Sequence, residues 1–234
     1  SPGSVTMEIQ DVPAIADAAH ARGVGVALDN TYAAGVMFDA FAHGVDVSMQ
    51  ALTKYVGGHS DLLLGSVSAR DGAAFEKLGP VYRQLGLAVS PDDCSLALRG
   101  LQTLPVRLAQ LEASTLQVAH NLADRSEIEA VFHPAFPTCP GHATWQRDFS
   151  GSTSVFSILF KGSVTPGQVE NFLEALELFH IGLSWGGVHS LAVVYPRLER
   201  PGKDFSGRLV RLNIGLEQPD DLIADLERAF ATIG

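Results

Sequence analysis

The stretch that most constrains the fold lies near the start of the chain, where a helical pattern runs directly into an apolar run. Apolar residues recur at helical spacing from Val12 to Arg22, with Asp11 placed to cap the helix and Gly23 placed to end it. Val24–Leu28 follows and is typical of a strand buried on both faces. A helix that feeds such a strand indicates a sheet with helices on its faces, so the sequence predicts an α/β fold.

A carboxylate and a lysine follow the first two predicted strands. Asp29 comes directly after Val24–Leu28, and Lys54 comes shortly after a second apolar run, Gly44–Met49. Ligands bind at the C-terminal edge of open α/β sheets. Gly57-Gly58 lets backbone approach a ligand closely, and a desolvated lysine has the lowered pKa that a Schiff-base amine needs. An aspartate at the same edge can keep a pyridine nitrogen protonated, so the pair predicts pyridoxal phosphate, PLP.

The rest of the chain continues to alternate helical and strand patterns. Leu62–Ala69 is predicted to be a further buried strand, and a long helix is predicted from about Pro91, with Asp92 or Asp93 as its N-cap and Pro105 as a kink or break. Beyond it we expect strands at 128–132, 154–160 and 209–214, and helices at 166–178 and 219–232 that each have proline in the first turn. The helices between strands indicate the end of a doubly wound sheet followed by a second, smaller unit.

Composition excludes several classes of protein. The 234 residues are 46% hydrophobic and 18% charged, typical of a well-packed globular protein. A net charge of −10 argues against a nucleic-acid partner, and no apolar run has the length of a membrane span. Cys94 and Cys139 are too few for a disulfide framework, so the chain is expected in a reducing cytoplasm. The expected partner is a small molecule.

Three stretches carry a family resemblance: Leu28–Gly35, Thr53–Tyr55 and Gly58–Asp61, which read LDNTYAAG, TKY and GHSD. They resemble the Cys/Met-metabolism branch of fold-type-I PLP-dependent enzymes, and within it the cystathionine β-lyases. The resemblance runs from Ser1 to the C-terminus. It implies that PLP is held by Lys54 as a Schiff base, that Asp29 pairs with the pyridine nitrogen, and that Thr53 contacts the phosphate.

The resemblance also implies a domain organisation. Residues 1–90 would be the C-terminal part of the large PLP-binding domain, with a mostly parallel sheet, residues 91–122 a bridging helix, and residues 123–234 a smaller C-terminal α/β domain. The family's phosphate loop and the aromatic ring that stacks on the cofactor would precede Ser1. We therefore expect the site to need an N-terminal segment missing from this sequence.

Ser184-Trp185-Gly186-Gly187 is a candidate substrate loop in the second half of the chain. By residue type alone, a strand end followed by a turn is the better interpretation. The resemblance implies that this loop lines the substrate pocket, with Ser184 near the bound amino acid and Trp185 helping to hold its carboxylate. Family members often continue with Glu-Ser, whereas His189 stands here in place of the glutamate.

Arg211 alternates with Val210 and Leu212 in an apolar strand, where an arginine is costly unless its guanidinium meets an anion. A planar guanidinium fits a carboxylate through two parallel hydrogen bonds. A salt bridge to Glu217 or Asp220 would satisfy it equally well. The resemblance implies that Arg211 clamps the substrate α-carboxylate, which leaves Arg208 as the exposed arginine.

Ser4 and Ala51 bear on the branch of the family. γ-Synthases and γ-lyases usually have an asparagine that contacts the cofactor's 3-hydroxyl at the position of Ser4, and Ser-Pro-Gly-Ser is similar to the β-lyase branch. Many relatives have a phosphate-binding serine at the position of Ala51, and alanine has no hydroxyl to donate. Ser4 is accordingly a candidate cofactor contact, and the phosphate relies on Thr53 and on residues outside this sequence.

Other polar residues predict no separate site. His133, Cys139 and His142 lie in a proline-rich stretch, but their spacing fits no closed four-ligand zinc pattern, so no metal is expected. His59 is interpreted as a structural hydrogen-bonding residue rather than a general base. Tyr55 either packs beside the cofactor or belongs to the core.

The resemblance implies a carbon–sulfur lyase. The expected reaction is PLP-dependent β-elimination of L-cystathionine, an amino-acid thioether, to homocysteine, pyruvate and ammonia in methionine biosynthesis. The alternatives are a cystathionine γ-synthase or γ-lyase type of enzyme, or a non-catalytic fragment of such an enzyme. The resemblance further implies a homotetramer, assembled as a dimer of dimers.

Overall fold

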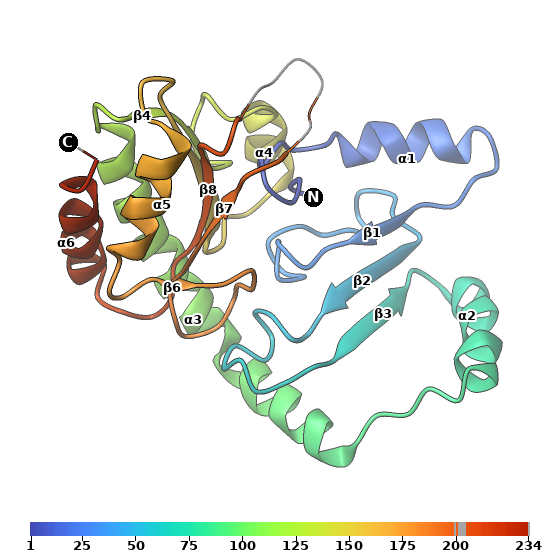
Figure 1. Ribbon diagram of the computed structural model, residues 1–234. Coiled ribbons are helices and arrows are strands. Elements are labelled where there is room, and N and C mark those ends of the chain that lie inside the picture. Colours follow the sequence, from blue (N-terminus) through green and yellow to red (C-terminus); the bar gives the residue numbers. More distant parts are fainter. Residues whose placement is uncertain (199, 201–204, 234) are drawn as a thin grey trace.

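The computed structural model describes residues 1–198, 200 and 205–233, and it confirms the predicted α/β fold (Figure 1). Its strands form two sheets, one of three strands in the order β1-β2-β3 and one of five strands in the order β4-β5-β8-β7-β6. A single long helix, α3, runs from beside the first sheet to the second (Figure 1). Among the described residues, no helix is both long and apolar enough to cross a membrane.

The three-stranded sheet carries the first half of the candidate site. Helix α1 (Val12–His20) is capped by Asp11, as predicted, and leads to β1 (Ala27–Asp29), which pairs in parallel with β2 (Val47–Ala51). The prediction of a strand at Val24–Leu28 buried on both faces is wrong. β1 begins at Ala27, and Ala27 and Asp29, which share one face of the strand, are exposed, whereas Leu28 on the other face packs against a core cluster.

Strand β3 (Gly65–Ala69) makes the described part of this sheet mixed, because it pairs antiparallel with β2, whereas β1 and β2 are parallel. A parallel return requires a crossover, usually a helix. The connection between β2 and β3 is instead a series of turns without a helix. β3 is also less buried than predicted, with Val67 58% exposed.

Two helices follow this sheet. The sequence analysis did not predict α2 (Gly72–Gln84), which is capped by Asp71 and has no buried residue. Helix α3 (Pro91–Ala123) is the long helix predicted, but its N-cap is Ser90, whose hydroxyl accepts the Asp93 N–H. Pro105 lies inside α3 without ending it. The proline removes a donor to the carbonyl of Leu101, and water can reach that residue because it is 51% exposed.

The five-stranded sheet contains the larger core. Its strands are β4 (Ile128–Phe132), β5 (Val155–Phe160), β6 (His180–Ile181), β7 (Leu191–Tyr195) and β8 (Leu209–Asn213), and only β6 and β7 pair in parallel. β4, β5 and β8 confirm predicted strands, and α5 (Pro166–Glu174) and α6 (Pro219–Phe230) confirm predicted helices with proline in the first turn. β6, β7 and helix α4 (His142–Asp148) were not predicted.

Alternation along β8 decides which side chains face the first sheet. Val210 and Leu212 pack in the core cluster with α3, α5 and α6. Leu209, Arg211 and Asn213 must therefore lie on the opposite face of β8. This is the face from which Arg211 reaches Trp185 and Asn213 reaches Gly186. The division into domains at residues 1–90, 91–122 and 123–234 stays a prediction.

Candidate functional site

Lys54 lies in a helix-like turn, residues 52–58, that begins after β2 ends at Ala51. The turn is closed by hydrogen bonds from Gly57 N to the Leu52 carbonyl, at 2.7 Å, and from Gly58 N to the Lys54 carbonyl, at 2.8 Å. Gly58 has φ +73°, a conformation that favours glycine. Lys54 therefore lies at the C-terminal edge of the parallel pair β1-β2, where the sequence predicted it.

The Lys54 amine contacts residues from the other half of the chain. Its Nζ donates a hydrogen bond to Ser184 Oγ at 2.8 Å and lies 4.1 Å from the centroid of the Trp185 ring. Partial burial lowers the pKa of Lys54 below its usual value, and the positive charge of Arg211 lowers it further. The structure thus brings together four predicted site residues, and their surroundings make the amine easier to deprotonate.

Asp29 ends β1 and is tied to the end of β2 by Thr31. Asp29 Oδ1 accepts hydrogen bonds from Thr31 N at 3.0 Å and from the Thr31 hydroxyl at 2.6 Å. The same hydroxyl accepts the Ala51 N–H at 2.9 Å. Thr31 therefore orients the carboxylate relative to the strand that leads to Lys54. Thr31 was not predicted to be a site residue, although it lies two residues after Asp29.

Trp185 forms the centre of an aromatic and cationic cluster. Its ring stacks on Tyr32 with centroids 4.9 Å apart and planes 3° apart. The Arg211 guanidinium carbon lies 5.2 Å from the Trp185 centroid and 5.6 Å from the Tyr195 centroid. Burial raises the pKa of Tyr32 to about 12, so its hydroxyl stays protonated. Tyr32 was quoted within a motif, but its contact with Trp185 was not foreseen because 153 residues separate them.

Arg211 is 5% exposed and donates a hydrogen bond to the Leu183 carbonyl at 2.5 Å. The acids considered as alternative partners have other contacts. Glu217 accepts hydrogen bonds from Ser190, and Asp220 accepts one from Gln117.

Arg208 was expected to be exposed, and this is wrong. Its side chain is 14% exposed, and its guanidinium donates to the Phe160 carbonyl at 2.6 Å and pairs with Glu129. The long side chain reaches back to the last residue of the neighbouring strand, β5, which alternation along β8 alone does not reveal.

Asn213 positions the loop that contains Ser184 and Trp185. Its Oδ1 accepts hydrogen bonds from Gly186 N at 3.1 Å and from the Ser154 hydroxyl at 2.8 Å. Gly186 has φ +78°, and a Cβ there would lie 3.0 Å from the backbone of Lys54 and Tyr55. Only glycine lets this loop lie against the Lys54 turn. Asn213 could have been found from sequence, because it lies two residues after Arg211 on the same face of β8.

Three further candidates do not contact Lys54 in hydrogen bonds that the structure describes. The Thr53 hydroxyl bonds to both backbone groups of Leu64, donating at 3.2 Å and accepting at 3.0 Å. Ser4 accepts a hydrogen bond from the Tyr32 hydroxyl through its carbonyl, at 2.9 Å. His189 is exposed and lies 3.8 Å from Glu217. The predicted roles of Thr53 and Ser4 toward a cofactor stay predictions.

Tyr55 and His59, which flank the glycines of the Lys54 turn, have structural contacts. Tyr55 is 1% exposed and its hydroxyl bonds to Ser154 Oγ at 3.0 Å. His59 Nδ1 lies 2.7 Å from the Gly57 carbonyl, which agrees with its interpretation as a hydrogen-bonding residue of the turn.

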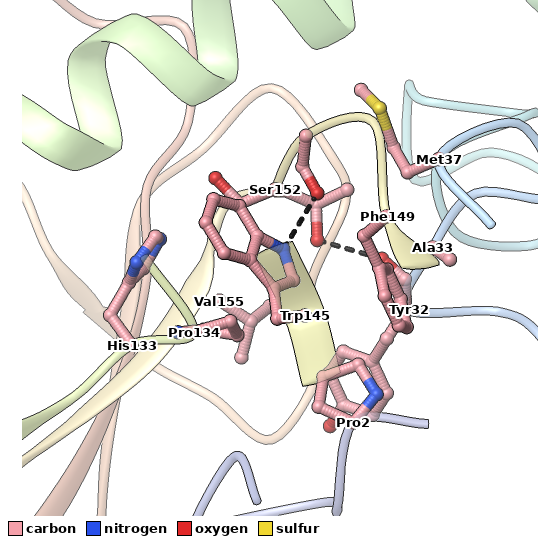
Figure 2. A pocket seen from close by; sticks show the side chains of 12 residues that line it. Pro2, Tyr32, Ala33, Met37, His133, Pro134, Trp145, Phe149, Ser152 and Val155 are labelled. Carbon is pink, nitrogen blue, oxygen red and sulfur yellow. Dashed lines mark hydrogen bonds between the residues drawn. The ribbon is translucent and has the colours of Figure 1, made fainter. Parts of the chain in front are cut away.

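A separate small cavity lies next to Tyr32 (Figure 2). It is lined by Pro2, Tyr32, Ala33, Met37, His133, Pro134, Trp145, Phe149, Gly151, Ser152, Thr153 and Val155. Figure 2 shows two hydrogen bonds at its wall, from Trp145 to the Gly151 carbonyl at 3.0 Å and from Thr153 to the Tyr32 carbonyl at 2.8 Å. His142 and Cys139 bond to the carbonyls of Pro134 and Met7. Within the described ranges, no three metal-binding side chains gather.

The side chains around Lys54 fit the chemistry of PLP. The amine with a lowered pKa suits an aldehyde, and the carboxylate of Asp29 suits a protonated pyridine nitrogen. Trp185 Nε1 is buried and, within the described residues, has no hydrogen-bond acceptor. This free donor beside Arg211 suits the carboxylate of an amino acid.

Comparisons with known proteins agree with this chemistry. The family model of the Cys/Met metabolism PLP-dependent enzymes matches residues 1–231. Cystathionine β-lyase MetC of Escherichia coli is 43% identical over 100% of this chain and 61% of its own length, and cystathionine β-lyase of Bordetella avium is 44% identical over 98% and 59%.

Solved structures show the same fold. CalE6, a methionine γ-lyase from Micromonospora echinospora, superposes with a TM-score of 0.90 at 33% identity, over 99% of this chain and 64% of its own. The chain thus spans about three fifths of the length of the curated relatives it matches. Since the family model covers nearly every residue, the chain belongs to the Cys/Met metabolism family of PLP-dependent enzymes.

Proposed function

We propose that the protein takes part in PLP-dependent β-elimination of L-cystathionine, which with water gives homocysteine, pyruvate and ammonia. The observation that carries the proposal is the meeting of Lys54 with Ser184 and Trp185, next to Arg211. A base and a carboxylate-binding cation both lie close to one indole ring, which suits an amino-acid substrate. The relatives named cystathionine β-lyase favour cystathionine as that substrate.

Two residues of this chain hold the cofactor in this proposal. Lys54 binds its aldehyde carbon through Nζ, and Asp29, oriented by Thr31, pairs with its pyridine nitrogen. Thr53 and Ser4 are proposed to contact its phosphate and its 3-hydroxyl. Bound PLP supplies an electron sink that stabilises negative charge on the substrate α-carbon.

The other roles belong to side chains that the structure describes. Arg211 and Trp185 Nε1 would bind the α-carboxylate and so orient the α-hydrogen toward Lys54. The Lys54 amine, when unprotonated and not bonded to the cofactor, would remove the α-proton, and its lowered pKa favours this role. Ser184 Oγ accepts a hydrogen bond from Nζ and holds it in place between these steps.

A γ-lyase or γ-synthase is the second candidate. The solved methionine γ-lyase of the same fold favours it, because removal of the α-proton begins both reactions and would use the same residues. The products separate the two reactions: pyruvate with homocysteine for β-elimination, and 2-oxobutyrate with cysteine for γ-elimination of cystathionine.

We infer a setting for this activity from the same residues. Cys94 and Cys139 do not form a disulfide in the described residues, and we propose a cytoplasmic protein. The β-lyase reaction would supply homocysteine for methionine biosynthesis. We propose a homotetramer and a site completed by an N-terminal segment. Without that segment, the 234 residues would be the third candidate, a non-catalytic fragment of such an enzyme.

The proposal is tested by adding PLP and borohydride, followed by mass analysis of the Lys54 peptide, to this chain and to a version extended N-terminally to the length of its relatives. We expect a reduced adduct on Lys54 in the extended chain, together with pyruvate and homocysteine from cystathionine. Lys54→Ala should abolish both, whereas Lys77→Ala, an exposed lysine of α2, should leave both unchanged. Normal turnover by Lys54→Ala would rule out Lys54 as the residue that binds PLP. An adduct in the extended chain but not in the 234-residue chain would support the candidate that the 234 residues are a non-catalytic fragment.

A further inference from the structure

Arg107 of helix α3 is a buried cation directly behind the Lys54 turn. It is 7% exposed, and its guanidinium makes four hydrogen bonds. Nη1 donates to the Tyr55 carbonyl at 2.7 Å, and Nη2 donates to the carbonyls of Gly100 at 2.7 Å and Val56 at 3.3 Å. Nε donates to the Thr103 hydroxyl at 3.0 Å. Two of these four acceptors belong to the residues that immediately follow Lys54.

These bonds replace the counter-ion that a buried arginine normally has. In the part of the chain that the structure describes, no carboxylate forms an ion pair with Arg107. Burying a cation is costly unless its donors are satisfied. Carbonyls at the C-terminal end of a helix-like turn have no partner within the turn and carry partial negative charge. The hydrogen-bond donors of the guanidinium and the carbonyl acceptors at the end of the Lys54 turn therefore satisfy each other.

Glycines allow this close approach. A Cβ on Gly58 would lie 2.2 Å from Arg107 Nη1, and a Cβ on Gly100 would lie 2.0 Å from the Val56 carbonyl oxygen. On the other side, Gly186 brings the Ser184–Gly187 loop against the backbone of Lys54. The turn is thus held between α3 and the substrate loop, with no side chain interposed at these three glycines.

We propose that Arg107 is a positioning residue that fixes the backbone of the Lys54 turn to helix α3, so that Lys54 Nζ meets Ser184 and Trp185. Helix α3 continues to the five-stranded sheet, where Val118 and Leu122 pack in the core with β8, the strand that carries Arg211. Arg107 therefore links the lysine to the scaffold that places the carboxylate-binding arginine. This inference rests on the proposed role of Lys54, and Arg107 acts through that residue without contacting substrate.

Hydrogen exchange of the chain, read by mass spectrometry without substrate, tests the first step. Arg107→Met should speed exchange of the amides at 52–58 by about tenfold or more, because the hydrogen bonds that hold the turn are lost. The matched control is Arg99→Met on the same helix, whose side chain is 63% exposed and pairs with Asp61. It should leave exchange at 52–58 unchanged. Parent-like exchange in Arg107→Met would overturn the proposal.

Peptides from β5 and β8 serve as the reference for global unfolding. If Arg107→Met also speeds exchange in these reference peptides, the milder variants Arg107→Lys and Thr103→Val test the proposal instead. Lysine keeps the charge but loses the forked geometry. Valine removes the Thr103 hydroxyl, which accepts from Arg107 Nε and donates to the Gly100 carbonyl at 3.2 Å. Both should accelerate exchange at 52–58 by less than Arg107→Met does. Parent rates in both variants would contradict the proposal.

A pH profile separates positioning of the amine from general loosening. The rate at which an acylating reagent modifies Lys54 is followed against pH by mass analysis, with the exposed Lys77 and Lys161 as references. In Arg107→Met the half-point for Lys54 should move up, by about half a pH unit or more, because the amine leaves Trp185 and regains water. A half-point equal to that of Arg99→Met would overturn the positioning role. Failure to cleave cystathionine would affect only the proposed reaction.

Discussion

His133 is a titratable residue sealed inside the protein, at the cavity of Figure 2. It is 0% exposed, its Nδ1 accepts the Ala135 N–H at 3.2 Å, and its Nε2 has no partner among the described residues. Burial and, to a smaller extent, the nearby His120 lower the pKa of His133 to about 4. The folded protein therefore favours the neutral form of the His133 imidazole.

The pKa of His133 predicts acid sensitivity. Since the folded pKa lies below the unfolded value of about 6.5, the unfolded chain binds more protons between them. The contribution of His133 to the free energy of unfolding should be complete above about pH 6.5. It should fall by about 3 kcal/mol by pH 4. Urea unfolding across this range measures the loss.

The variant His133→Phe isolates that contribution, because it keeps an aromatic ring and cannot be protonated. The difference in unfolding free energy between parent and variant should change by about 3 kcal/mol between about pH 7 and pH 4. His20→Phe, on the exposed end of α1, provides a histidine control. A constant difference between parent and His133→Phe would show that His133 does not titrate in the folded protein.

Glycine has different roles in the two helices that follow the first sheet. Gly100 lies inside α3 at the point where the helix meets the backbone of Val56 and Gly57. Gly79 lies inside α2 directly before Pro80, and beyond its chain neighbours a Cβ there would meet the end of the Arg83 side chain, at 3.6 Å. A helix interior favours alanine over glycine unless the glycine is needed for close packing.

We therefore expect the two glycine-to-alanine substitutions to differ in size. Gly79→Ala should change the free energy of unfolding by less than about 1 kcal/mol, because the higher helix propensity of alanine is offset by crowding of its Cβ against Pro80, the next residue. Gly100→Ala should lower it by about 2 kcal/mol or more, because a new methyl group 2.0 Å from a carbonyl oxygen must push the helix away. Chemical denaturation of both variants gives the two values, and a stabilised Gly100→Ala would contradict the packing described here.

The two sheets differ in how well the molecule buries them. Every residue of β5 and β8 is buried, whereas β1, β2 and β3 contain exposed or partly exposed residues, and α2 has no buried residue. Few buried contacts make local opening easier, so stability should be unequal across the molecule. The Lys54 turn is attached to the less buried sheet and depends on α3 and on the loop at Gly186 for its support.

Native-state hydrogen exchange should show this difference. Amides of β5 and β8 should exchange only through global unfolding, and amides of β1 and β3 should exchange faster by about a hundredfold or more. Low concentrations of denaturant should accelerate the first group and leave the second nearly unchanged. Equal protection of both sheets would mean that the molecule opens as one cooperative unit.

The sequence by itself determined the local features. Asp11 caps α1, prolines begin α5 and α6, and Asp29 and Lys54 lie at or just after the ends of two adjacent parallel strands. Caps, periodicity and strand ends depend on neighbouring residues. The motif at Lys54 also pointed to the family that the chain matches. Helix α2 was not predicted, although Phe75, Leu78 and Tyr82 recur at helical spacing, and Gly79 and Pro80 inside it are residues that disfavour a helix.

Only the tertiary structure decided what lies around Lys54. The contact with Ser184 joins residues 130 positions apart, and the support from Arg107 joins carbonyls and a guanidinium 51 and 52 positions apart. Nor did residue type show that β3 runs antiparallel or that Arg208 is covered. Hydrogen bonds within a helix or cap join residues a few positions apart. The contacts around Lys54 join distant residues, so they form only when α3 and the Ser184–Gly187 loop pack against the Lys54 turn.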